Sequence, residues 1–171
     1  MNWFKEFVFA NNLKARIQRN LKDKKEIKNL SKFIGILVDE SAIDSIGSLE
    51  KEIAEWKKKG KKVEVFRFRD EKEIAEEISD TYCRKQINWA GIPKGEHIDR
   101  FIDTTFDILI TINPDQKKSL QYINAVSKAK FKIGLEAEDL QYNNLIIDCK
   151  QSSQVKTSFK EIQLTLDKLA I

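Results

Sequence analysis

Apolar residues occur along this chain in short runs, separated by longer stretches with a different periodicity. The runs occupy residues 33–39, 61–68, 83–89, 106–112, 130–135 and 144–149, and each has the length of a β-strand. Continuous runs such as FIGILVD and FDILITI are typical of strands that helices cover on both faces. The run CRKQINW, residues 83–89, is more polar, which predicts a strand at the edge of the sheet.

Between these runs, apolar residues recur at the three- and four-residue spacing of amphipathic helices. The spacing predicts helices over about residues 45–59, 70–79, 98–102, 115–128 and 155–169. Strand and helix therefore alternate. Right-handed crossovers then give a three-layer, Rossmann-like α/β domain, in which a mainly parallel six-stranded sheet carries helices on both faces. The most apolar strand, 106–112, is expected near the centre of the sheet.

The first 32 residues form a basic region in front of this pattern. They carry nine Lys or Arg and three acidic residues, which gives a net charge of +6. Since the whole chain has a formal net charge of +4, residues 33–171 have a net charge of −2. On a helical wheel Lys5, Arg16 and Arg19 fall on the face opposite to a group of apolar residues, which are Trp3, Phe7, Ala10, Leu13, Ile17 and Leu21. We therefore divide the chain into a basic amphipathic helical arm, residues 1–32, and a single α/β domain, residues 33–171.

The arm is compatible with three kinds of contact. Its apolar face packs on the domain, self-associates, or lies on an anionic membrane or nucleic acid with its basic face engaged. The side chains concerned are Trp3, Phe7, Arg16 and Arg19. No apolar run is long enough to span a membrane, and the N-terminus lacks the features of a secretory signal peptide. The two cysteines, Cys83 and Cys149, form no disulfide framework, which favours a cytoplasmic protein, with peripheral membrane association left open.

The motifs of common catalytic sites are missing from the sequence. The loop after the first strand, DESAIDSIGS, has one glycine and neither a GxGxxG nor a Walker A sequence, so we expect no dinucleotide or other cofactor. Its carboxylates could bind Mg²⁺ or share a proton, but a solvated loop with a helix cap is the simpler interpretation, and we expect no metal. The lone histidine, His97, is interpreted as a surface residue. Catalysis is therefore disfavoured, though not ruled out.

A ligand site, if the domain has one, should lie where doubly wound sheets bind ligands, outside the carboxyl ends of the strands at the switch in strand order. This places it between the loops after the first, third and fourth strands. There Trp89 would stack on the ligand, Asn88 and Asn113 would form hydrogen bonds, and Asp39 would coordinate or accept. For Trp89 itself the favoured interpretation is a different one, in which the side chain folds back and covers the core.

Four segments carry a family resemblance: NW-x-G-x-P at 88–93, FDILI at 106–110, QYINAVSKAKFKIG at 121–134 and LIIDC at 145–149. With them the chain resembles a family of uncharacterised bacterial proteins that share one domain of unknown function. More distantly, residues 106–134 resemble the N-terminal half of heptosyltransferase-type glycosyltransferases, which implies a similar fold and transfers no catalytic residue.

Three functional hypotheses follow. The first, which the missing motifs favour, is a non-catalytic binding or accessory domain on a Rossmann-like scaffold. The second is a glycosyltransferase-like half-domain that binds a nucleotide- or sugar-containing ligand. The third is association with a membrane surface or nucleic acid through the basic arm.

Overall fold

The architecture was established from a computed structural model, which describes residues 32–42, 46–74, 78–134 and 142–147 together with Ile162, Leu164 and Thr165. The described residues form six strands: β1 (Phe33–Asp39), β2 (Lys62–Arg69), β3 (Thr81–Cys83), β4 (Ile108–Ile112), β5 (Phe131–Gly134) and β6 (Leu145–Ile146). The α-helices are α2 (Ile46–Lys58), α3 (Glu96–Asp103) and α4 (Lys118–Val126), and two 3₁₀ turns, η1 (Glu40–Ala42) and η2 (Arg84–Gln86), follow β1 and β3.

The strands form one sheet in the order β3-β2-β1-β4-β5-β6, and every pair is parallel. This is the strand order of the classical dinucleotide-binding fold, with its switch between β1 and β4. The Rossmann-like α/β prediction is therefore confirmed, as is the central place of β4. Ile110 lies between Ile36 of β1 and Ile133 of β5.

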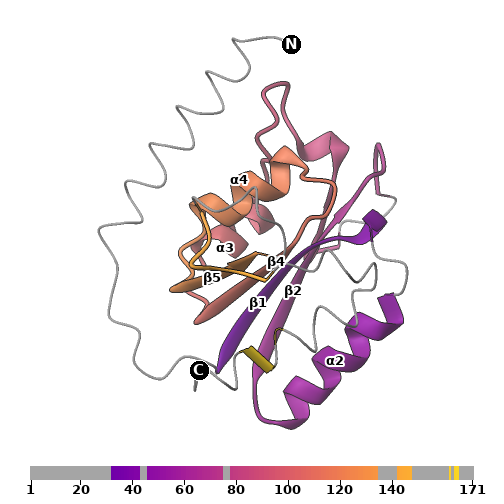
Figure 1. Ribbon diagram of the computed structural model, residues 1–171. Helices are drawn as coiled ribbons and strands as arrows, with labels where there is room; N and C mark the ends of the chain where they lie inside the picture. Colours follow the sequence, from indigo (N-terminus) through magenta and orange to yellow (C-terminus); the bar gives the residue numbers. More distant parts are fainter. Residues whose placement is uncertain are drawn as a thin grey trace.

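Helices cover both faces of the sheet, as Figure 1 shows, with α2 on one side and α3 and α4 on the other. The side chains of each strand alternate between the two faces. Those on the α2 face are mostly isoleucine and valine and pack with Leu49, Ile53 and Trp56 of the helix. Those on the other face include aromatic rings, and Phe66 stacks on both Tyr82 and Phe101 at centroid distances of 5.4 and 4.7 Å. Two separate apolar layers thus hold the sheet.

The third strand lies at the sheet edge, as predicted, but it occupies residues 81–83 instead of 83–89. Its three side chains are buried, so the expected polar strand was placed too far along the chain. The cause is local: the side-chain oxygen of Gln86 accepts the backbone N–H of Cys83 at 2.9 Å, which ends the strand and closes η2. The helix predicted over 70–79 is also wrong where it can be checked, because 70–74 and 78–79 are not helical.

Several predictions fall on residues that are not described. The basic arm, including Trp3, Phe7, Arg16 and Arg19, lies outside the described residues, as does Cys149. Of the helix predicted over 155–169, Ile162 is helical and fully buried on the α2 face, whereas Leu164 is helical and half exposed. No helix in the described part of the chain is long and apolar enough to cross a membrane.

Candidate functional site

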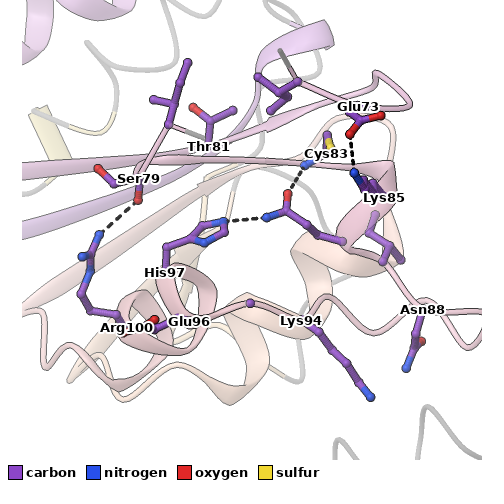
Figure 2. Close-up of a pocket in the computed structure, with 15 residues that line it drawn as sticks. Glu73, Ser79, Thr81, Cys83, Lys85, Asn88, Lys94, Glu96, His97 and Arg100 are labelled. Carbon is purple, nitrogen blue, oxygen red and sulfur yellow. Dashed lines mark hydrogen bonds and ion pairs between the residues drawn. The ribbon is translucent and has the colours of Figure 1, made fainter. Parts of the chain in front are cut away.

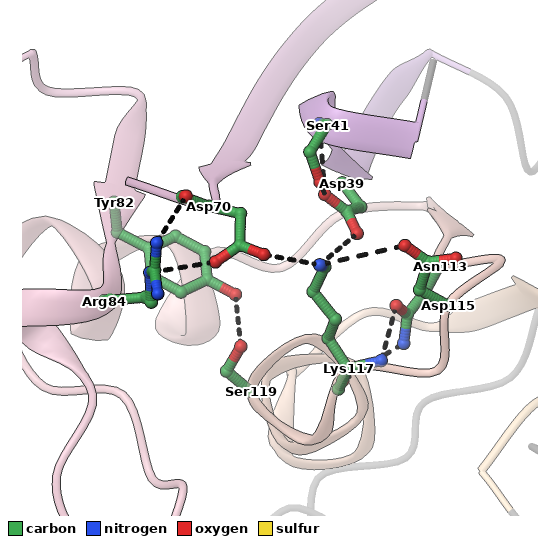
Figure 3. A network of polar contacts seen from close by, with 9 residues as sticks. All are labelled: Asp39, Ser41, Asp70, Tyr82, Arg84, Asn113, Asp115, Lys117 and Ser119. Carbon is green, nitrogen blue, oxygen red and sulfur yellow. Dashed lines mark hydrogen bonds and ion pairs between the residues drawn. The ribbon is translucent and has the colours of Figure 1, made fainter. Parts of the chain in front are cut away.

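The crevice at the strand-order switch contains an ion pair between Asp39 and Lys117. Asp39 is the last residue of β1, beside Phe68 of β2 and on the same face of the sheet as Leu37, which α4 covers. Its side chain has no exposed surface, and its Oδ2 lies 3.3 Å from the Nζ of Lys117, the residue before α4. Lys117 also lies 3.1 Å from Asp70 and 3.8 Å from Asp115 (Figure 3).

The surrounding charges favour the ammonium form of Lys117. Burial lowers the pKa of this lysine, but the hydrogen bond to Asp70 and the charge of Asp39 outweigh burial and hold the pKa above its ordinary value. The other carboxylate oxygen of Asp39 accepts hydrogen bonds from the backbone N–H and the hydroxyl of Ser41 at 3.1 and 2.5 Å. Oδ1 of Asp39 thus accepts two hydrogen bonds, whereas Oδ2 has the ion pair with Lys117 and accepts no hydrogen bond within the described part of the chain.

Asn113 stabilises the loop between β4 and α4. Its side-chain oxygen accepts the backbone N–H of Lys117 at 2.8 Å, and its amide nitrogen donates to the carbonyl of the same residue at 3.1 Å. Glu40, next to Asp39, pairs with Arg69 at 2.7 Å. The structure thus brings Asp39 and Asn113 close to each other, as the sequence predicts. Asn113 would have to release a hydrogen bond before it could contact a ligand there, and the carboxylate of Asp39 is fully buried and paired with Lys117.

Trp89 projects from a loop that backbone and side-chain hydrogen bonds hold in one shape. The side-chain oxygen of Asn88 accepts the N–H groups of Ala90 and Ile92, both at 2.9 Å, and Asn88 N–H donates to the carbonyl of Ile92 at 2.9 Å. Gly91 has φ of 85°, which a glycine adopts without strain. Trp89 is 57% exposed, so the interpretation that it covers the core is wrong.

A cavity of about 820 Å³ lies beside β3, between the segment that enters this strand and the N-terminal half of α3. We name it the edge cavity; Figure 2 shows its lining. The apolar part of its wall is formed by Ile74, Ile78 and Ile87, and its uncharged polar groups include Gln86, Asn88 and His97. Its charged groups are Lys85, Lys94, Arg100, Glu73 and Glu96. Asn88 is the one residue of the predicted site that lines this cavity, and Trp89 follows it directly.

His97 occupies a central position in the edge cavity. It is half-buried, which corrects its interpretation as a surface residue, and its Nε2 lies 3.0 Å from the amide nitrogen of Gln86. Arg100, one turn further along α3, lines the same cavity and donates to the carbonyl of Ser79 at 3.1 Å. Residues three apart on a helix lie on the same face. The spacing of His97 and Arg100 was therefore the sequence signal that could have placed them in one site.

Cys83 also lines the edge cavity, yet its placement does not resemble a Cys–His catalytic pair. The thiol is 3% exposed and lies 3.8 Å from the carbonyl oxygen of Lys72. The side chain of Gln86 bridges the backbone of Cys83 and the ring of His97, so Nε2 of the imidazole is already engaged with Gln86. Among the described residues, no three His, Cys, Asp or Glu side chains are grouped as a metal site would require.

Fold and site together define a Rossmann-like α/β protein in which an internal ion pair occupies the switch crevice, while a cavity of about 820 Å³ opens beside the sheet edge. The chain matches a family of unknown function, DUF6913, over residues 5–169, and it belongs to that family. Neither a curated protein nor a solved structure matches it. The distant resemblance of residues 106–134 to heptosyltransferase-type glycosyltransferases stays a prediction.

Proposed function

We propose that this chain is a non-catalytic binding domain whose ligand site is the edge cavity. The observation that carries the proposal is the size and lining of that cavity. A volume of about 820 Å³ is in the range of small-molecule sites, which typically occupy roughly 300–1,000 Å³. Such sites combine apolar walls with a few oriented polar groups, and the isoleucines and the His97–Gln86 pair supply both.

The state of the switch crevice supports the choice of the edge cavity. In a parallel sheet of this order the ligand ordinarily lies outside the carboxyl ends of β1 and β4. There the carboxylate of Asp39 is fully buried and paired with Lys117, and Asn113 fastens the loop that carries this lysine. Removing one partner of a buried ion pair costs free energy. A ligand that displaced Lys117 from Asp39 would therefore bind with lower affinity.

Trp89 adds an aromatic surface next to the same cavity. Its loop is held in one shape, so little conformational entropy is lost when a partner binds to it. Tryptophan presents a large area for stacking, and it is enriched among residues that dominate binding energy. The stacking role predicted for Trp89 is therefore kept in the proposal, with the ligand in the edge cavity instead of the switch crevice.

A fragment screen monitored by two-dimensional NMR of the full chain tests the proposal. Fragment hits should perturb the backbone amides of residues 83–88 and 94–100, and His97→Ala should weaken the best hits. Lys51→Ala, on the exposed face of α2, should leave them unchanged. Hits that cluster at residues 39–41 and 113–117, or the absence of hits at the edge cavity, would contradict the proposal.

The screen should include sugar nucleotides, because they distinguish the proposal from a glycosyltransferase-like half-domain. That alternative predicts binding of a sugar nucleotide at the loops after β1 and β4, with amide perturbations near Asp39 and Asn113. The binding domain proposed here predicts that any such ligand perturbs the amides of the edge cavity.

A further inference from the structure

The hydrogen bonds around Gln86 determine which nitrogen of His97 carries the proton. The backbone N–H of Cys83 is a donor, so the Gln86 side-chain atom that faces it at 2.9 Å must be the oxygen. The amide nitrogen of Gln86 then faces His97 at 3.0 Å. Because an amide nitrogen can only donate, Nε2 of His97 accepts, and the proton of the neutral ring is on Nδ1.

The Nδ1 side of the ring is open because residue 95 is a glycine. A Cβ on Gly95 would lie 3.1 Å from Cε1 and 3.5 Å from Nδ1 of His97, and the φ of 155° is one that side chains rarely adopt. His97 has the Gln86 hydrogen bond and a ring contact with Phe66, and within the described residues no acceptor faces Nδ1. The imidazole therefore presents a ready N–H donor on this side.

Arg100 supplies a positive charge on the same face of α3. One of its terminal nitrogens donates to Ser79, and this bond holds the guanidinium beside the cavity while its remaining N–H groups stay exposed (Figure 2). Of the other charged groups that line the cavity, Lys85 and Glu73 neutralise each other in an ion pair, and Glu96 is a carboxylate one helical turn before Arg100. Lys94 extends away from His97. An N–H donor and a guanidinium one turn apart match the oxygens of an anionic group.

We infer that the edge cavity binds an oxyanion, a carboxylate or phosphate group of the ligand, through Nδ1–H of His97 and the guanidinium of Arg100. Gln86 is a positioning residue that fixes the donor tautomer of His97. This inference rests on the proposed function and names the chemical class of its ligand. The shared chemistry is a negatively charged oxygen that accepts two hydrogen bonds.

Titration of the full chain with inorganic phosphate and, separately, with acetate tests the inference at constant ionic strength, with the side-chain ¹⁵N signals of His97 as the readout. Without ligand, these signals should show the proton on Nδ1, and binding should shift them. Phosphate alone, acetate alone or both would each identify the accepted oxyanion and support the site. A proton on Nε2 in the free protein, or no shift with either anion, would overturn the inference.

Variants separate the site from nonspecific attraction. Arg100→Ala should weaken anion binding about tenfold or more, because a hydrogen bond to a charged group is lost. Lys94→Ala, which removes a cation directed away from His97, should have a much smaller effect; equal losses in the two variants would contradict the site. Gln86→Leu should mix the two tautomers of His97 and weaken binding, while the folded spectrum is retained.

The map of fragment-perturbed amides separates the oxyanion inference from the proposed binding function. If fragments still perturb the edge cavity but neither anion shifts the signals of His97, the oxyanion inference fails and the binding function stands. If fragments and anions both leave the cavity unperturbed, the proposed function fails as well.

Discussion

Nζ of Lys117 lies 3.3 Å from Oδ2 of Asp39, a carboxylate with no exposed surface. The contact joins the end of β1 to the start of α4 across the switch in strand order. Asp70, which follows β2, lies 3.1 Å from the same ammonium group. One lysine at the start of α4 therefore contacts carboxylates at the carboxyl ends of β1 and β2. At the position where Rossmann-like sheets ordinarily bind a ligand, this chain places an internal ion pair.

Lys117→Met should therefore destabilise the domain by about 3 kcal/mol, because it leaves a buried carboxylate without its cation. The methionine preserves most of the apolar stem but loses the ammonium group, whose Nζ lies 5.5 Å from the ring centroid of Phe68. Urea unfolding followed by circular dichroism measures the change. Lys58→Met, which removes an exposed ion pair with Glu55, serves as the control and should stay within about 0.5 kcal/mol of the parent.

Combining Lys117→Met with Asp39→Asn should recover most of the loss. The double variant removes both charges, and the asparagine oxygen keeps the hydrogen bonds from Ser41. We expect it to lie within about 1 kcal/mol of the parent chain. Simple additivity of the two single losses would show that the charges do not interact.

Asp107 should make the stability depend on acid pH. It accepts the N–H of Phe33 at 3.0 Å and the ammonium of Lys130 at 2.6 Å. Burial raises the pKa of this carboxyl, but the two hydrogen bonds outweigh it and hold the pKa below the ordinary 3.8. Its contribution is therefore complete above the unfolded-state pKa and is lost as pH falls through the lower folded-state value.

Asp107→Asn should accordingly cost about 1 kcal/mol at neutral pH. The difference from the parent should shrink when unfolding is repeated well below the ordinary pKa of aspartate. A difference that stays constant between neutral and acid pH would show that the charge of Asp107 contributes nothing.

Two glycines should respond in opposite directions to alanine. A Cβ on Gly35, in the central strand β1, would lie 2.9 Å from the ring of Phe106, which is fully buried and packs against Phe33 and Phe101. Gly35→Ala should cost about 1–3 kcal/mol through overpacking. Gly47 is exposed in α2 with no atom within 4 Å of that position, so Gly47→Ala should add about 0.5 kcal/mol. Thermal unfolding tests both, and equal effects would contradict this account of Gly35.

Thr111 carries a hydroxyl that is buried without a hydrogen-bond partner among the described residues. Thr111→Val keeps the shape and removes the polar atom, so it should stabilise the domain by about 1 kcal/mol. Thr111→Ser keeps the hydroxyl and loses the methyl group, so it should destabilise by a similar amount. Loss of stability in the valine variant would mean that the hydroxyl has a partner.

The order of elements follows from the sequence because buried parallel strands give unbroken apolar runs. FIGILVD and FDILITI have this form, and they became β1 and the adjacent β4. The position of β3 could not be predicted in the same way. Its end is set by one side chain, Gln86, whose bond to Cys83 has no signature in periodicity.

The candidate site was predicted in part. The strand order places Asp39 and Asn113 near each other, which the sequence predicts. That Lys117 fills the crevice between them depends on its ion pair with Asp39, a contact between residues far apart in the sequence. The edge cavity depends on the course of the segment before β3, where the predicted helix did not form in the residues that are described. A lone histidine gave no indication of a cavity, because its significance comes from Gln86 and Arg100 around it.

The central claim is that ligands bind in the edge cavity and not at the switch crevice. Its most direct test is the dissociation constant of the best fragment hit, measured for the parent chain, His97→Ala and Asp39→Asn. The account predicts that His97→Ala weakens binding about tenfold or more, while Asp39→Asn leaves it within about twofold. The reverse pattern, with affinity lost in Asp39→Asn and kept in His97→Ala, would contradict it.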